Sequence, residues 1–396
     1  MTVPLHQRRT FFILFIAIFV AMLGVGVIAP TMPIYVKELG ASGFWLGIIY
    51  ASFSLSRLIF MPIAGYLSDS RGRKGFIIFG LLTYALASVG YVWASSVIQI
   101  AWIRMLHGVG SAMVIPIATA VIGDIAPNGE EGKIMGNFQV ALFLGFGTGP
   151  LLGGFVMQTW SINEVFYLMG FLSLFSLIII ARFLTESNDT RHQEKIDQGW
   201  RELWNNKIFL GIFIFRFANA YGRAAILSFL PIFADHLHVS PAQIGFLVSL
   251  NIFLTAILQR VTGKIADRHS RSLLIAVGNG IAAGSILFLP LAQNFVHFIL
   301  FGTVMGIGSA IAFPAAGAVA TTLGRQYGMG TVMGQFNMGM SVGGIFGALL
   351  TGWMMDLFGI NYVFLSSGII GLIGSLFCRI FIKKKPRSIS NIHVSL

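Results

Sequence analysis

Long apolar runs separated by short polar connections make up nearly the whole chain. Each run reaches the length of about 20 mainly apolar residues that an α-helix needs to cross a bilayer. The twelve predicted spans are residues 11–33, 44–66, 75–95, 98–122, 133–157, 164–184, 207–233, 241–263, 273–293, 296–320, 331–355 and 360–382. The pattern therefore predicts an all-α membrane protein with twelve transmembrane helices.

The composition changes this picture only by excluding other classes. Of the 396 residues, 56% are hydrophobic and 10% are charged, whereas soluble domains carry about 25% charged residues. The net charge of +12 comes from basic residues in short connections and forms no continuous face, so we reject nucleic-acid binding. Cys378 is the only cysteine, which excludes an intramolecular disulfide and a multi-thiol metal site.

The basic residues also predict the orientation in the membrane. They gather before the first span, in the second-to-third, sixth-to-seventh and eighth-to-ninth connections, and in the C-terminal tail. The connections on the other side hold one clear basic residue, Lys37. Since positive charge stays inside, we expect both termini in the cytoplasm. The short loops and compact ends favour the inner membrane of a bacterium.

The chain also divides into two similar halves. A polar stretch separates an N-terminal six-helix bundle (1–184) from a C-terminal one with a short basic tail (207–396), which predicts a cytoplasmic linker at 185–206. A shift of 198 residues places Gly65 on Gly263, Asp69 on Asp267 and Arg73 on Arg271. Coincident Asp and Arg residues are rare by chance in such an apolar chain. Two homologous bundles predict rocking about a central site, which is alternating access.

The connection after the second span carries a charged motif. The segment Gly65-Tyr66-Leu67-Ser68-Asp69-Ser70-Arg71-Gly72-Arg73-Lys74 resembles the loop signature of the major facilitator superfamily, although Ser70 stands where a basic residue is usual. A carboxylate can bind the N-terminal end of a neighbouring helix, and the basic residues can pair with Asp124. The resemblance implies a conformational latch; the alternative is a plain positive-inside anchor. The candidate latch residues are Gly65, Asp69, Arg73, Lys74, Gly263, Asp267 and Arg271.

The fifth span carries a glycine pattern, G-x8-G-x3-G-P-x2-G-G. Its residues are Gly136, Gly145, Gly149, Pro150, Gly153 and Gly154. It resembles the antiporter motif that separates exporters from importers in this superfamily. Glycines four residues apart let a partner helix pack against bare backbone. The expectation of export rests on the resemblance.

The fourth span carries Arg104 and, three residues on, His107. The pair resembles the buried-arginine motif of the same superfamily, with His107 where Gln is usual. Histidine titrates near neutral pH and can carry a proton. We therefore take Arg104, His107 and Asp124 as candidates for proton coupling. The alternative is that Arg104 ties helices together through backbone carbonyls.

The resemblance extends over the whole chain and is strongest to the twelve-span drug:proton antiporters. It implies a monomeric secondary active transporter that exports lipophilic or amphipathic small molecules in exchange for protons.

The acidic residues depart from that branch, because none of the 14 falls in the middle of a span. The deep charges are instead Arg57, Arg104, Arg216 and Arg223, and Arg57 and Arg216 are expected near the midplane. Either the arginines grip a negative or zwitterionic group of the substrate, or they are structural. The first reading predicts an exporter of an anionic amphiphile, a lipid-like molecule or a metabolite. The candidate cavity residues are Arg57, Phe138, Gln139, Arg216, Asn219, Tyr221, Phe336 and Asn337.

Other function classes find less support. The sequence has no phosphate-cradling G-x-x-x-x-G-K-[ST] pattern, so we expect no ATP-driven step. A membrane-embedded enzyme would need nucleophiles, paired carboxylates or metal ligands at membrane depth, and a sensor would add a soluble domain. We expect no catalytic residue, no cofactor and no metal.

Overall fold

The computed structural model describes residues 5–126, 131–186 and 199–383, and these ranges are almost entirely helical. The α-helices are α1 (Leu5–Val27), α2 (Met32–Glu38), α3 (Gly43–Arg71), α4 (Lys74–Trp93), α5 (Val97–Ile125), α6 (Glu131–Thr159), α7 (Ile162–Phe183), α8 (Gly199–Asn205), α9 (Lys207–His236), α10 (Pro241–Arg268), α11 (Arg271–Phe288), α12 (Phe295–Tyr327), α13 (Met329–Phe358) and α14 (Ile360–Lys383). One 3-10 turn, η1 (Leu289–Leu291), follows α11. Twelve segments are long and apolar enough to cross a membrane, which confirms the predicted fold class.

The first predicted span is broken into two helices. α1 ends at Val27 and α2 begins at Met32. Pro30 lies in the break and Pro33 in the first turn of α2; proline has no backbone N–H to continue a helix but is well accommodated in a first turn. The Thr31 hydroxyl donates to the Ile28 carbonyl at 3.2 Å within the break.

Several helices run beyond the apolar segments. α3 continues through Arg71 and α10 through Arg268, so residues 67–71 and 264–268, expected in connections, are helical. α3 ends at Arg71, and the next residue, Gly72, has a φ of 92°, which favours glycine. The predicted linker contains the short helix α8 and otherwise falls largely on 187–198, outside the described residues. The three-part division of the chain therefore stays a prediction.

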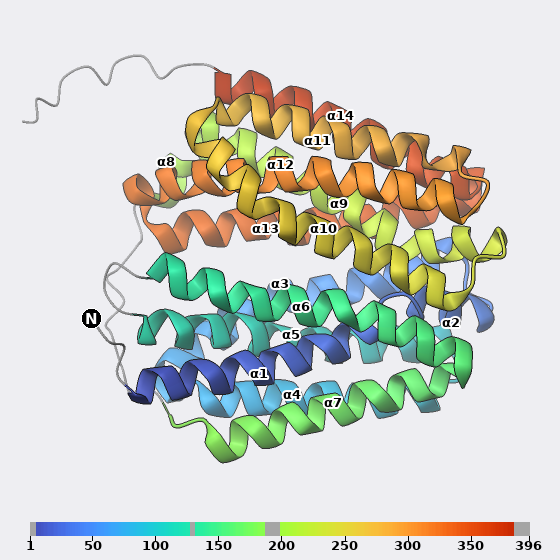
Figure 1. The fold of residues 1–396 in the computed structure, drawn as a ribbon, viewed down its shortest axis with the longest axis horizontal. Helices are drawn as coiled ribbons and strands as arrows, with labels where there is room; N and C mark the ends of the chain where they lie inside the picture. Colours follow the sequence, from blue (N-terminus) through green and yellow to red (C-terminus); the bar gives the residue numbers. More distant parts are fainter. Residues whose placement is uncertain (1–4, 127–130, 187–198, 384–396) are drawn as a thin grey trace, which may run out of the picture.

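The helices pack as two groups with the same internal arrangement. Figure 1 shows α1 and α3–α7 in its lower half and α9–α14 in its upper half. In the lower group α1 packs against α6 and α7, α3 against α5, and α4 against α7. In the upper group α9 packs against α13 and α14, α10 against α12, and α11 against α14. These are the pairs that a shift of six spans produces, so the sequence repeat is also a repeat of packing.

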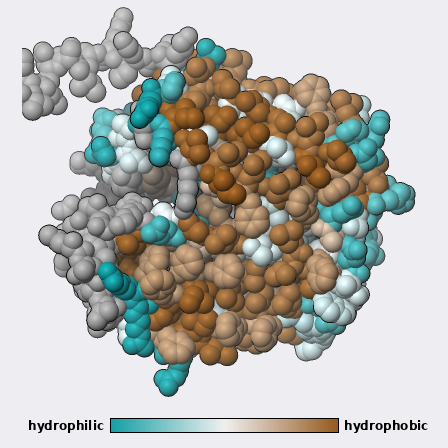
Figure 2. Space-filling model, viewed as in Figure 1, coloured by the Kyte–Doolittle hydropathy of each residue, from teal (hydrophilic) through white to brown (hydrophobic). Residues whose placement is uncertain are grey.

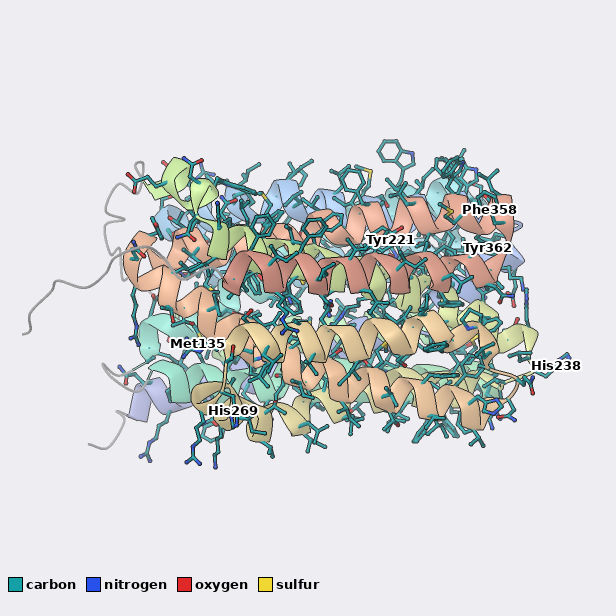
Figure 3. All side chains as sticks on the ribbon, turned by 90° about the horizontal axis from the view of Figure 1, so that it is seen from above. Met135, Tyr221, His238, His269, Phe358 and Tyr362 are labelled. Atoms are coloured by element: carbon teal, nitrogen blue, oxygen red, sulfur yellow. The ribbon has the colours of Figure 1, made fainter. Side chains whose placement is uncertain are left out.

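The two ends of the molecule differ from its middle. Figure 2 shows a broad hydrophobic band across the helices, with hydrophilic residues towards both ends. We call the end where α1 begins, α3 meets α4 and α14 ends the terminal end, and the other the opposite end. Figure 3 places Met135 and His269 near the terminal end and His238, Phe358 and Tyr362 near the opposite end.

The halves touch closely toward the opposite end. α3 packs there against α13 and α6 against α10. A Cβ added at Gly43 would lie 2.7 Å from the Gly352 carbonyl oxygen, and one added at Gly154 would lie 3.1 Å from the Ala242 Cα. Only glycine permits such an approach of two backbones.

The terminal end is open by comparison. A Cβ at Gly65, Gly136, Gly263 or Gly334 would find no neighbour within 4 Å in the described structure. No described neighbour therefore packs closely against Gly65 in this conformation.

Candidate functional site

Two adjoining cavities lie between the halves. The first has a volume of about 380 Å³ and is lined by α1, α3, α4, α5 and α6 of one half and by α9 and α13 of the other. The second, of about 770 Å³, lies between α6 and helices α9, α10, α12 and α13. Phe143, Ala220, Arg223 and Met340 line both. Both volumes fall in the range of small-molecule sites, about 300–1,000 Å³.

Four arginines line these cavities. Arg57, Arg104 and Arg223 line the first, and Arg216 and Arg223 line the second. No Asp or Glu is among the described lining residues of either cavity. The centre of the molecule therefore carries positive charge without a lining carboxylate.

The arginines are held by aromatic rings. The Arg104 guanidinium lies 4.9 Å from the centre of the Tyr50 ring and 5.6 Å from that of Phe53. The Arg216 guanidinium lies 5.1 Å from the Phe313 ring and 5.0 Å from the Phe336 ring. Such contacts stabilise a guanidinium without neutralising its charge.

α9 presents several polar groups because of their spacing. Arg216, Asn219 and Arg223 lie three and four residues apart, so they share one face of the helix. All three line the second cavity, beside Gln139 and Gln259. This face places two positive charges and amide groups where the halves meet.

The predicted cavity residues divide into two sets. Arg57, Gln139, Arg216, Asn219 and Phe336 line one of the two cavities.

The structure places Phe138, Tyr221 and Asn337 elsewhere. Phe138 is fully buried inside its own half, and Tyr221 is 2% exposed beside the backbone of Gly347. Consecutive residues of a helix point about 100° apart. Each of these three residues is next in the chain to a residue that lines a cavity, but its own side chain points in another direction. The sequence also missed Tyr50, Tyr84 and Phe313, because an aromatic residue in a span has no signal that separates cavity from packing.

His107 lies in an aromatic box behind Arg104. Its side chain is fully buried, its Nδ1 lies 3.1 Å from the Tyr91 hydroxyl, and its ring meets the Tyr84 ring edge-on at 4.8 Å. Its Nε2 has no hydrogen-bond partner in the described structure. Phe53 contacts both this ring and the Arg104 guanidinium. The structure thus brings two of the three coupling candidates together.

Asp124, the third candidate, belongs to a charged cluster at the terminal end. Arg73 forms ion pairs with Asp124 on α5 and, at 3.1 Å, with Asp69 on α3. Glu186, which the sequence analysis missed, accepts from the backbone N–H groups of Arg73 at 2.6 Å and Lys74 at 3.1 Å. Its carboxylate caps the N-terminus of α4. The cluster therefore joins α3, α4 and α5 to the segment that follows α7.

The second copy of the motif has different partners. Arg271 donates to the Ala318 carbonyl at 3.3 Å and to the Thr322 hydroxyl at 3.0 Å, both on α12. Asp267 lies in α10, but its side chain is outside the described part of the structure.

Polar contacts reinforce the closed opposite end. The Asp356 carboxylate at the end of α13 accepts from the backbone N–H groups of Gly43 at 2.6 Å and Phe44 at 2.8 Å. It thereby caps α3 of the other half. At the same end Lys37 of α2 lies 4.0 Å from Asp235 and 2.5 Å from His236, both on α9 of the other half. The sequence could not reveal these contacts, since they join residues about 200 or 300 positions apart.

Comparison with known proteins supplies the family. The model of the Major Facilitator Superfamily matches residues 14–220 and 212–394. An uncharacterized MFS-type transporter of Methanocaldococcus jannaschii is 32% identical over 372 residues, covering 92% of this chain and 96% of the relative. The chain belongs to the major facilitator superfamily. It is therefore a membrane transporter rather than an enzyme.

Other members of the superfamily align over nearly their full length. Multidrug resistance protein 2 of Bacillus subtilis is 28% identical over 96% of this chain and 97% of its own. Quinolone resistance protein NorA of Staphylococcus aureus is 26% identical over 89% of this chain and 91% of its own. A bacterial homolog of the human lysosomal transporter Spinster, solved in an inward-facing and occupied conformation, shares the fold with a TM-score of 0.82 at 14% identity, covering 96% of this chain and 98% of its own.

In this major facilitator the glycines of α6 face two partners. A Cβ at Gly149 would lie 2.6 Å from the Gly26 Cα of α1, and Gly145 and Gly153 also face the α1 backbone. Pro150 and Gly154 face α10 of the other half instead. One helix thus joins a contact within its half to the contact between halves.

Proposed function

We propose that this major facilitator is a secondary active exporter of lipophilic and amphipathic small molecules, driven by proton entry. The observation that carries the proposal is a central cavity lined by both halves, which touch closely at one end only. Two further observations support it: the relatives named as multidrug and quinolone resistance proteins, and the complete glycine pattern on α6.

The proposal places the terminal end in the cytoplasm, in the inner membrane of a bacterium. The basic residues that support this orientation lie at that end, among them Arg71, Arg73, Lys74, Arg268 and Arg271. The cavity is then open to cytoplasmic substrate. A single chain suffices for the cycle, since both halves of the site are in one molecule.

The transport cycle follows from the two sets of contacts. Opening the opposite end requires α3 to separate from α13 and α6 from α10. Closing the terminal end brings the Arg73 cluster toward the other half, where it acts as the latch. Substrate and protons drive the cycle only through different affinities for the two states.

The proton path of this proposal uses Arg104 and His107. They adjoin the cavity and share the Phe53 ring. Asp124 takes the role of a latch residue, because it is paired with Arg73 about 20 residues along α5 from Arg104, roughly 30 Å at 1.5 Å per residue.

A transport assay tests the exporter. Proteoliposomes with an acidic lumen should accumulate rhodamine 6G or 8-anilinonaphthalene-1-sulfonate. Transporter molecules whose terminal end faces the outside of the vesicle carry the dye into the lumen. The lumenal pH, read with pyranine, should rise at the same time. Nigericin, which collapses the pH gradient, should abolish accumulation. If the folded protein transports neither dye, the proposal of export is wrong. If accumulation continues in nigericin, export is not driven by the pH gradient.

A histidine substitution tests the coupling residue. His107→Gln keeps a hydrogen-bonding side chain beside Tyr91 but cannot titrate, so uphill accumulation should be lost while dye exchange without a gradient continues. His297→Gln, at the opposite end, is the matched control and should behave as the unmodified protein. Normal uphill transport by His107→Gln would exclude this path.

A further inference from the structure

The central arginines form no ion pair with a described carboxylate, and the hydrogen bond that the structure gives Arg216 runs from its Nη2 to the Met340 Sδ at 3.1 Å. All ion pairs among the described side chains lie near helix ends: Lys37 with Asp235, and Arg73 with Asp69 and Asp124. Arg57 and Arg223 donate no hydrogen bond to any described residue. The Arg223 guanidinium lies 5.6 Å from the centre of the Phe313 ring. The Nε atoms of Arg104 and Arg216 are buried without a hydrogen-bond partner in the described structure.

Such an arrangement is unfavourable unless something completes it. Removing a guanidinium from water costs several kcal/mol, and an opposite charge or several good acceptors must offset that cost. Aromatic rings offset about 0.5–2 kcal/mol each. The remaining requirement is for an anion, and the planar guanidinium binds carboxylate, sulfonate and phosphate groups through two parallel hydrogen bonds.

The four arginines are not equivalent. Arg104 is 6% exposed, lies against the Tyr50 and Phe53 rings, and belongs to the proposed proton path rather than to the anion site. Arg57 belongs to α3 of one half and Arg223 to α9 of the other, and both line the first cavity. An anion between them would attract both halves toward itself.

The walls between these arginines are apolar. Leu142, Phe143, Phe146 and Ile115 line the same cavity, together with Met22 and Leu227. A ligand that fills it therefore needs an apolar body beside its charged group.

We propose that the cargo of this exporter is an amphipathic anion, a single oxyanion group on an apolar body, held between Arg57 and Arg223 with Arg216 beside them. This inference rests on the proposed function and assigns its substrate class. A lipophilic cation, in contrast, would enter a cavity that holds positive charge and no described lining carboxylate.

A binding experiment with three matched probes tests the charge preference. The probes are 1-naphthalenesulfonate, 1-naphthylmethylammonium and 1-naphthalenemethanol, which share a ring system and differ in charge. The purified protein is held in nanodiscs of phosphatidylcholine, and Kd is measured by isothermal titration. The sulfonate should bind at least tenfold more tightly than the ammonium and the alcohol. Equal or tighter binding of the ammonium would overturn the inference.

Substitutions then test the residues. Arg57→Gln and Arg223→Gln should each weaken sulfonate binding at least tenfold, while Arg182→Gln, which removes an exposed charge from α7, should leave it unchanged. Arg57→Lys keeps the charge without the fork and should recover part of the affinity. If both Gln variants remain folded, as judged by an unchanged melting temperature without ligand, and bind the sulfonate normally, the site is wrong.

The anionic group can belong to a free molecule or to a lipid headgroup. Replacing part of the phosphatidylcholine by phosphatidylglycerol distinguishes them. Weaker sulfonate binding would identify a lipid headgroup as the competing occupant, and unchanged binding would identify a free anion; both outcomes keep the anionic site. If the protein transports rhodamine 6G but does not bind the sulfonate, the proposed export function stands and the proposed anionic cargo is wrong.

Discussion

At the scale of single residues, charged side chains have different partners at the two ends of this transporter and in its middle. Carboxylates lie near the ends and are matched there: Asp356 caps α3, Glu186 caps α4, and Asp124 pairs with Arg73. The middle holds guanidinium groups among aromatic rings. Charges near the ends therefore join helices, whereas the arginines in the middle lie against aromatic rings and line the two cavities.

The cap formed by Asp356 leads to a prediction about the closed end. Asp356→Asn removes a charge that accepts two backbone N–H groups of the other half. The loss of a charged partner at a helix N-terminus costs about 1–2 kcal/mol, so the opposite end should open roughly 5- to 30-fold more often. Electron paramagnetic resonance between labels at Ser161→Cys and His238→Cys, in a Cys378→Ser background, measures this opening.

Asp235→Asn is the matched control for that measurement. Asp235 and Lys37 are 4.0 Å apart and both partly exposed, and an exposed ion pair contributes about 0–1 kcal/mol. The label distances should therefore change little. Equal effects of the two substitutions would show that net charge, rather than the helix cap, controls the closed end.

The Arg73 cluster leads to a second prediction at the residue scale. Arg73→Gln removes both ion pairs at once, so transport should fall strongly while membrane insertion is retained. Arg71→Gln removes an exposed arginine of the same connection and should transport nearly normally. Initial rates of dye accumulation in proteoliposomes compare the two. If both variants lose the same fraction of activity, the motif is only an anchor of positive charge.

At the scale of helices, α6 shows how one element serves two contacts. Gly145, Gly149 and Gly153 face α1, and Pro150 and Gly154 face α10. Substitutions at neighbouring positions of α6 should therefore affect different interfaces, either the contact with α1 or the contact with α10.

Three alanine substitutions on α6 should separate these contacts. Gly149→Ala should destabilise its own half and lower the melting temperature. Gly154→Ala should disturb mainly the junction with α10, so the spin-label distance at the opposite end should grow. Gly136→Ala meets no neighbour within 4 Å, and should be neutral or stabilising by up to about 1 kcal/mol. The same effect from all three would mean that helix propensity rather than packing decides.

The sequence predicted helices far better than their faces. Span count and repeat follow from apolar length and from rare residues such as Asp69 and Asp267. Arg57 and Arg216 were expected in the cavity because charges seldom face lipid. Phe138 was expected in the cavity beside Gln139, but only Gln139 lines it. In a helix that is apolar all round, the sequence period does not show which face contacts lipid, which packs against other helices and which lines a cavity.

At the scale of the whole molecule, the repeat explains why the closed end has two equivalent junctions. The pair α3–α13 and the pair α10–α6 are exchanged by a shift of six spans. At both junctions glycines lie directly against the backbone of the other half. The two junctions should therefore open together, because each half moves as one packed group.

The anionic cargo that we propose also has a bioenergetic consequence. A carrier that exchanges one entering proton for one departing monovalent anion moves two positive charges inward in each cycle, whereas exchange for a monovalent cation moves none. Each charge is worth about 2.3 kcal/mol per 100 mV, so anion export would draw about 4.6 kcal/mol from such a membrane potential. In proteoliposomes without a pH gradient, a potassium diffusion potential set with valinomycin, positive in the lumen, should drive 8-anilinonaphthalene-1-sulfonate into the lumen. A carrier of this kind would remain active in cells whose cytoplasm and surroundings have the same pH.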